Sequence, residues 1–483
     1  MNGVKQKSFK INAVLNIIKQ LCIIIFPMIT FPYVSRVLGV EAYGKLNFST
    51  SIMGYVTLIA GLGVYSYAVR NGSQLRDDKQ KFEKFACEVF SINMASTVAA
   101  YAIMILALIF WKSLNPYKTI MLILSINILL STLGTDWVNT VYEDFLFITI
   151  RYIVCQSIAV VLILTFVKST KDLELYALLS NCGTISANIL NIYHIRKKLK
   201  LKIHFTLKMN LKQHIKPILI LFGNTISSMI YLYADSSMLG IIQGDIAVAY
   251  YAVASKIYTM IKQLLNAVAT VATPKFSHDV VNENKQKLNI EFNSLIGTLL
   301  LFLMPAVAGL LCIGKEIIIL LSGVEYVESY TALAILSLSL ICSTIACIYV
   351  GVVMLALGKD KKILLSTTIS ALVNIVLNFI LIPKYSYNAA ALTTLISELI
   401  MMILGIYFTK NHLRLQIKKQ GVVAIAGMLW VFAVCNIVKY FLIENILILI
   451  LSISISMIGY GGIILISYRN NIRNYKNNFL SRL

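Results

Sequence analysis

The sequence predicts an all-α polytopic membrane protein with fourteen transmembrane helices, and three observations predict this class. Of the 483 residues, 58% are hydrophobic and only 13% are charged, and a soluble fold cannot keep so much apolar surface from water. Apolar runs recur along the chain, each close to the roughly 20 residues that a helix needs to span a bilayer. Lysine and arginine gather in alternate connections between these runs.

The expected spans follow one another with short connections, and their even number predicts both termini on one side of the membrane. The spans are 11–34, 46–69, 85–110, 117–139, 146–167, 173–195, 217–240, 246–270, 292–314, 329–356, 362–382, 387–409, 421–441 and 445–468.

The distribution of positive charge sets the orientation. With the N-terminus inside, 30 of the 43 lysines and arginines fall in inside segments, 9 in outside segments and 4 within spans. Cytoplasmic segments of membrane proteins carry the excess of Lys and Arg. We therefore expect both termini in the cytoplasm.

The most basic connection is 196–216, which carries eight lysines and arginines and no acid. It is preceded by six spans, in 1–195, and followed by eight. We expect it to be a cytoplasmic linker between two membrane-embedded halves. A nucleic-acid-binding arm would need a soluble setting, which the flanking sequence does not provide.

Little sequence outside the spans is left for a catalytic domain. All eight cysteines fall in apolar runs without a C-x-x-C pair or a Cys/His cluster, so neither a disulfide framework nor a metal site is expected. The run 309–315 resembles the start of a phosphate-binding loop, but Glu316 replaces the Ser or Thr that would hold magnesium. We expect no cofactor, and an enzyme is the weaker class.

Polar side chains inside the spans are the candidate functional residues, because they are costly in hydrocarbon and should face a bundle interior or a hydrated cavity. In the seventh span, Asn224, Ser228, Tyr231 and Asp235 share one helical face. The eighth span carries Lys256 and Lys262 on two polar stripes, and the eleventh carries Asn374. The alternative is that the neutral residues only join neighbouring helices.

Within the spans, positive charges outnumber acids, which favours an anionic cargo. Lys19, Arg151, Lys256 and Lys262 are the cations, and Asp235 and Glu398 are the acids and candidate ion-coupling residues. A pair of Asp235 with Lys256 is an open alternative, as is a fixed pair of Glu398 with Lys19, Lys256 or Lys262. Pro27 and Pro32 predict a kink in the first span.

Six sequence runs follow one another in a recognisable order, namely FPYVSRVLG (31–39), GLGVYSYAVR (61–70), ITIR (148–151), DSSMLG (235–240), VAYYAVASKI (248–257) and AAALTTLISE (389–398). In this order they resemble the Wzx-type polysaccharide flippases of the multidrug/oligosaccharidyl-lipid/polysaccharide exporter superfamily. Two of these runs contain Arg36 and Arg70, further candidates for substrate binding. Ser236 departs from the family, which often has Lys there, and puts a charge contact at that point in doubt.

The resemblance implies two six-helix lobes around a central cavity, 1–195 and 217–410, with two peripheral helices and a basic tail in 411–483. It implies a bacterial cell-membrane flippase that moves undecaprenyl-diphosphate-linked oligosaccharide from the inner to the outer leaflet by alternating access. Capsule, O-antigen or a teichoic-type polymer would be the product. A proton or sodium ion, membrane lipids, and the polymerase and glycosyltransferases of the pathway are the implied partners.

Two other classes stay open. A cation-coupled multidrug exporter of the same superfamily would prefer an apolar or acidic cavity, which the surplus of lysine and arginine does not favour. A membrane-bound polysaccharide polymerase or ligase would normally show a large outside loop, and the expected spans leave no such loop.

Overall fold

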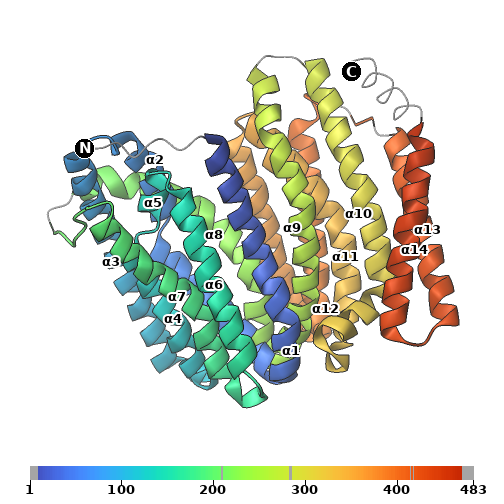
Figure 1. The fold of residues 1–483 in the computed structure, drawn as a ribbon, viewed down its shortest axis with the longest axis horizontal. Coiled ribbons are helices and arrows are strands. Elements are labelled where there is room, and N and C mark those ends of the chain that lie inside the picture. Colours follow the sequence, from blue (N-terminus) through green and yellow to red (C-terminus); the bar gives the residue numbers. More distant parts are fainter. Residues whose placement is uncertain (1–8, 208–209, 282–284, 414, 417, 470–483) are drawn as a thin grey trace. The chain divides into compact units, whose positions relative to one another are not determined.

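The computed structural model describes residues 9–207, 210–281, 285–413, 415–416 and 418–469, which are almost wholly helical and contain no β-strand (Figure 1). Contacts divide the chain into two compact units, Met1–Ala249 and Tyr250–Leu483. The lobe limits expected from the sequence, 195 and 217, stay a prediction.

The N-terminal unit contains eight helices, of which α1 is central because it packs against α3, α6 and α8. In the same unit, α7 packs against both α4 and α6. The helices are α1 (Phe9–Gly61), α2 (Val64–Leu75), α3 (Lys79–Phe110), α4 (Lys118–Gly134), α5 (Trp137–Val141), α6 (Phe145–Phe166), α7 (Leu173–Lys197) and α8 (Leu211–Ile242).

The C-terminal unit begins within the first turns of α9 (Asp245–Val281). Its helix α10 packs against α11 and α13, α11 packs against α12, and α13 packs against α14. The other helices are α10 (Lys285–Ser322), α11 (Ser329–Ala346), α12 (Asp360–Thr409), α13 (Lys418–Phe441) and α14 (Asn445–Ser467), and a π-helical stretch, Cys347–Met354, follows α11.

A non-helical residue divides α1 in two. Gly39 has φ 70° and ψ 176°, a conformation that is essentially open only to glycine. Pro27 and Pro32 lie inside the first half, where the backbone stays helical. The break therefore falls between the expected spans 11–34 and 46–69 rather than at the prolines.

The expected span 46–69 is wrong as a continuous helix. It is interrupted at Leu62 and Gly63, which have φ 45° and 74°, and α2 starts afterwards. Gly63 also lies close to α8, because a Cβ there would approach the Phe222 nitrogen to 2.8 Å. A left-handed backbone and a tight helix contact together explain the break.

The long helix α12 is divided at Ser386, with φ 50° and ψ −134°. This residue lies between the expected spans 362–382 and 387–409, which are confirmed as separate helical segments. Elsewhere, the expected span 117–139 stops early, because α4 ends at Gly134 and Thr135 has φ 45°.

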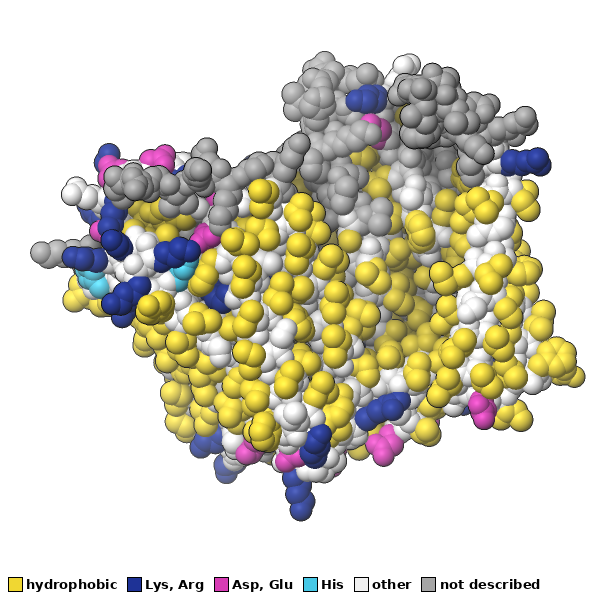
Figure 2. All heavy atoms as spheres, in the orientation of Figure 1, with side chains coloured by type: hydrophobic (Ala, Val, Ile, Leu, Met, Phe, Trp, Pro, Cys, Tyr) yellow, Lys and Arg dark blue, Asp and Glu magenta, His cyan; other side chains and the backbone are white. Residues whose placement is uncertain are grey.

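By length and composition, nine helical stretches of the described chain could cross a membrane, and a bent pair within α8 brings the number to ten. Two of the nine contain the breaks at Gly39 and Ser386, so each of these covers two expected spans. In Figure 2 the visible helical faces are mostly hydrophobic, and charged side chains gather toward helix ends. The all-α multi-pass membrane fold is confirmed, and the count of fourteen stays a prediction.

The described first part of the basic linker packs along α3. The Lys202 nitrogen donates to Glu83 Oε1 at 3.0 Å, and the Thr206 nitrogen donates to Ser91 Oγ at 2.8 Å. Leu201, only 3% exposed, joins the core of the N-terminal unit. The first part of the linker is thus anchored to that unit.

Candidate functional site

A partly buried charged cluster lies in the N-terminal unit and consists of Lys19, Asp136 and Arg151, called here the Arg151 cluster. Arg151, on α6, has a side chain only 5% exposed, and its Nη2 donates to Asp136 Oδ1 at 2.5 Å. Lys19, on the neighbouring α1, is half-buried and within electrostatic reach of both. Within this cluster, two cations thus lie near one acid.

Arg151 keeps unused donors. Its Nε and Nη1 are buried without a hydrogen-bond partner among the described residues. A buried unsatisfied donor costs about 1–3 kcal/mol, and more on a charged group. A guanidinium in this state is suited to a second anion, because its fork of donors matches phosphate oxygens.

Aromatic stacking orients the Arg151 side chain. The Arg151 Cζ lies 5.2 Å from the centroid of the Phe147 ring, and Phe147 stacks on His194 at 3.7 Å between centroids. His194 Nε2 lies 3.2 Å from Asp144 Oδ2. Sequence reasoning missed Phe147 and His194, although the spacing of four residues between Phe147 and Arg151 places them on one helical face.

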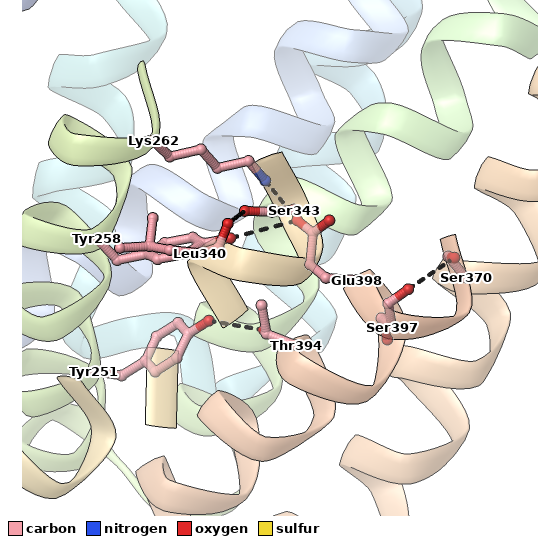
Figure 3. A network of polar contacts seen from close by, with 9 residues as sticks. All are labelled: Tyr251, Tyr258, Lys262, Leu340, Ser343, Ser370, Thr394, Ser397 and Glu398. Carbon is pink, nitrogen blue, oxygen red and sulfur yellow. Dashed lines mark hydrogen bonds and ion pairs between the residues drawn. The ribbon is translucent and has the colours of Figure 1, made fainter. Parts of the chain in front are cut away.

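A second polar network lies in the C-terminal unit, where α9 meets α12 (Figure 3). It consists of Tyr251, Tyr258, Lys262, Thr394 and Glu398, called here the Glu398 network. Lys262 Nζ donates to Glu398 Oε1 at 2.5 Å, and Tyr258 Oη donates to the same oxygen at 3.4 Å. Tyr251 Oη and Thr394 Oγ1 lie 3.3 Å apart. Among the three lysines considered as partners of Glu398, the structure therefore selects Lys262.

Lys256, also on α9, differs from Lys262. It is partly exposed, and no described residue forms a hydrogen bond or an ion pair with it. An unpaired ammonium in an apolar helix is costly unless it is hydrated or meets an anion. A substrate-binding role for Lys256 stays a prediction.

Asn374 lies between the two halves of α12. It is 1% exposed, and its Nδ2 donates to Thr393 Oγ1 at 3.4 Å. Its Oδ1 accepts from Asn378 Nδ2 at 3.1 Å, and Thr393 in turn donates to Asn378 Oδ1 at 2.5 Å. These hydrogen bonds join the two segments of α12, as expected if neutral polar residues only join neighbouring helices. A substrate-binding role for Asn374 stays a prediction.

The other predicted residues are dispersed. Arg36 and Arg70 are exposed, and Tyr231 is partly buried on α8. Asp235, only 6% exposed, interacts electrostatically with Tyr55, whose hydroxyl lies 3.1 Å from Ser237 Oγ. The side chain of Asn224 lies outside the described residues. Within the described ranges, no three His, Cys, Asp or Glu side chains are grouped to hold a metal ion.

Known proteins share both sequence and fold with this chain. A protein of Escherichia coli (strain K12) named as an O-antigen transporter is 22% identical over 401 residues, which cover 80% of this chain and 93% of that protein. A protein of Haloferax volcanii named as a low-salt glycan biosynthesis flippase is 26% identical over 194 residues, covering 40% of this chain and 41% of its own length.

Among solved structures, the lipid II flippase MurJ in an inward closed conformation matches with a TM-score of 0.74 at 20% identity. The match covers 95% of this chain and 100% of that one, and it is a likeness of fold. These proteins are named as transporters and flippases, so the enzyme class is set aside and the resemblance to Wzx-type flippases is confirmed. The sequence model of the family described as polysaccharide biosynthesis protein matches residues 9–280, more than half of the chain, and the chain belongs to this family.

Proposed function

We propose that the protein is a flippase that moves undecaprenyl-diphosphate-linked oligosaccharide from the inner to the outer leaflet of the bacterial cell membrane. The product would be a surface polysaccharide such as capsule, O-antigen or a teichoic-type polymer. The observation that carries the proposal is the Arg151 cluster, which combines a surplus of positive charge with guanidinium donors that no described residue uses.

The chemistry of the cargo matches this cluster. A diphosphate presents oxygens that accept charge-assisted hydrogen bonds, and arginine binds such oxygens in bidentate geometry. Asp136 holds one side of the guanidinium and leaves Nε and Nη1 for the ligand. Lys19, half-buried on α1, adds positive charge to this cluster. Lys256, in the C-terminal unit, is a separate cation that we propose for contact with the cargo.

The named relatives support the same class of cargo, since one is an O-antigen transporter and another a glycan biosynthesis flippase. Alternating access is the mechanism that we propose, with Asp235 and Glu398 as candidate residues for coupling to a proton or sodium gradient. Glycosyltransferases would supply the lipid-linked repeat, and a polymerase would use it. The surplus of positive charge does not favour a multidrug exporter. No specific observation in the described structure favours either a multidrug exporter or a polysaccharide polymerase or ligase.

The experiment uses purified protein in lipid vesicles, with flipping measured as the exposure of undecaprenyl-diphosphate-linked oligosaccharide to an impermeant glycosidase. Arg151→Ala and Lys19→Ala should each lower the rate at least tenfold, and Arg151→Lys should retain more activity than Arg151→Ala. Lys256→Ala should also lose transport. Lys112→Ala, which changes an exposed lysine outside the cluster, is the control. Normal transport by the folded Arg151→Ala protein would overturn the diphosphate clamp, by which we mean binding of the cargo's diphosphate by the Arg151 cluster.

A further inference from the structure

A small pocket adjoins the Arg151 cluster in the N-terminal unit, and its lining combines polar and apolar side chains. It has a volume of about 130 Å³ and lies among α1, α2, α3, α4 and the start of α5. We call it the Trp137 pocket, and its lining includes Gly61, Tyr65, Asn93, Ser131, Asp136 and Trp137 beside apolar residues such as Ala60 and Ile128. Asp136 belongs to both sites, since it lines the pocket and accepts the hydrogen bond from Arg151.

The indole of Trp137 points to a missing partner. Trp137 is 3% exposed, and its Nε1 is buried without a hydrogen-bond acceptor in the described structure. Buried Trp N–H groups usually find a partner, and each exception in a folded protein needs an explanation. The rings of Phe82 and Phe85, at 6.2 and 6.4 Å between centroids, hold the indole in place.

The pocket offers both donors and acceptors, as a ring of neutral hydroxyl groups requires. Asp136 accepts, Trp137 donates, and the Ser131 hydroxyl can do either. Asn93 donates to the Ala60 carbonyl at 2.8 Å through Nδ2, which leaves its Oδ1 as an acceptor. The carboxylate disfavours a phosphate group in the pocket itself, and the volume of about 130 Å³ is too small for a long lipid tail.

The size of the pocket also limits its ligand. Pockets that hold drug-sized ligands have about 300–1,000 Å³, so this one suits a single sugar ring rather than a whole repeat unit. Because Asp136 joins the pocket to the Arg151 cluster, a ring bound here would be adjacent to a diphosphate bound there.

We propose that the Trp137 pocket is a sugar subsite, which binds the sugar ring attached directly to the diphosphate of the cargo. The proposal rests on the proposed function. It assigns recognition of the first sugar to the N-terminal unit, with the Trp137 N–H and the Asp136 carboxylate bound to ring hydroxyls.

The test compares binding of lipid probes with and without a sugar to the purified full-length protein. The probes are undecaprenyl diphosphate and its conjugates with single glucose, galactose or N-acetylglucosamine residues. Trp137→Phe removes the N–H and keeps a ring. Gly61→Leu places a side chain at the pocket, where a Cβ meets no atom within 4 Å. Gly461→Leu, at a helical glycine of α14 with equally open surroundings, is the matched control.

We expect at least one conjugate to bind more tightly to the unaltered protein than undecaprenyl diphosphate does. Trp137→Phe and Gly61→Leu should weaken binding of that conjugate about tenfold, the loss that corresponds to about 1.4 kcal/mol. Both variants should bind undecaprenyl diphosphate as before, and Gly461→Leu should bind both probes normally. Arg151→Ala should weaken binding of both probes.

The inference is overturned if no conjugate binds more tightly than the bare diphosphate, or if Gly61→Leu leaves the preference intact. It is also overturned if Trp137→Phe and Gly61→Leu weaken both probes equally, since the pocket then does not read the sugar. If Trp137→Phe does not fold, Gly61→Leu decides alone. If Arg151→Ala binds both probes as the unaltered protein does, the diphosphate clamp is wrong. The sugar preference is then still decided by Trp137→Phe and Gly61→Leu.

Discussion

The Glu398 network shows what sequence can and cannot resolve for a single residue. The acid and its three candidate lysines follow from counting charges within spans, because each ionised group in hydrocarbon needs a partner or water. The choice of Lys262 depends on how α9 and α12 are rotated against each other, which no periodicity encodes. In the structure, Tyr251, Tyr258 and Lys262 follow at intervals of seven and four residues on the α9 face that meets Thr394 and Glu398.

The pair predicts a specific rescue. Glu398→Gln leaves the Lys262 ammonium, 23% exposed, without its counter-charge, and breaking a buried pair costs on the order of 3–5 kcal/mol. We therefore expect a lower thermal unfolding midpoint in detergent, measured by fluorescence. Adding Lys262→Met should restore most of the midpoint, whereas adding Lys256→Met should not. Equal rescue by both methionines would contradict the pair.

The same variants separate structure from coupling. If Glu398 carries the coupling ion, the double variant Glu398→Gln with Lys262→Met should fold and bind lipid-linked oligosaccharide but lose acceleration by a proton or sodium gradient. Full gradient dependence in that variant would assign Glu398 a structural role alone.

At the scale of helices, two breaks determine how the long segments are divided. The sequence locates separate apolar runs on either side of Gly39 and Ser386, and the structure breaks α1 and α12 at these two residues. The sequence misses the turn at Leu62 and Gly63, because the run stays apolar enough for one span despite its glycines and the close contact with α8 is a tertiary feature.

Gly39 should be intolerant of a side chain. Its φ of 70° and ψ of 176° lie in a region open essentially to glycine alone, and strain of this kind costs about 1–3 kcal/mol. Gly39→Ala should lower the unfolding midpoint of the purified protein. Gly462→Ala, in the interior of α14 where a Cβ meets no atom within 4 Å, should leave it unchanged or raise it. A neutral Gly39→Ala would show that the helix can straighten at this point.

The loop between α6 and α7 should respond to acid. Hydrogen bonds from the backbone of Lys168 and Ser169 hold the pKa of Asp172 below its ordinary value of 3.8. Because the pKa is depressed in the folded loop, the stabilising contribution is present above pH 3.8 and is lost as the pH falls through the folded value. Hydrogen exchange, corrected for intrinsic rates, should show these two amides losing protection at low pH.

A substitution provides the control for this loop. In Asp172→Asn, the backbone amides of Lys168 and Ser169 should already show low protection from hydrogen exchange at neutral pH. Their protection should not fall further in acid, because the asparagine side chain cannot titrate. An unchanged acid response in Asp172→Asn would assign the loosening to another group.

At the scale of the whole molecule, composition is sufficient to predict a multi-pass membrane protein, and the charge distribution predicts its orientation. The candidate site can be predicted from the sequence only in part. The sequence shows Arg151 as an unusual cation in a span, but its partner Asp136 lies beyond the end of α4, and only the fold brings the two side chains together. The Trp137 pocket is lined by residues of five helices, α1 to α5, so no local sequence pattern marks it. A charged residue that is unusual within an apolar run can therefore be found from the sequence. A residue whose role depends on neighbours from other helices cannot.

The orientation itself is testable with cysteines introduced at exposed lysines of both units. In a background without the eight native cysteines, Lys171→Cys and Lys315→Cys represent expected outside positions, and Lys81→Cys and Lys361→Cys expected inside positions; all four lysines are exposed. The bias of lysine and arginine predicts that an impermeant maleimide added to intact cells labels the first two variants only. All four should react after the membrane is permeabilised, which controls for access. Labelling of Lys81→Cys in intact cells would show that the N-terminal half has the opposite orientation. If Lys361→Cys is labelled and Lys81→Cys is not, the number of spans between Lys81 and Lys361 is odd, whereas the fourteen-helix arrangement requires an even number.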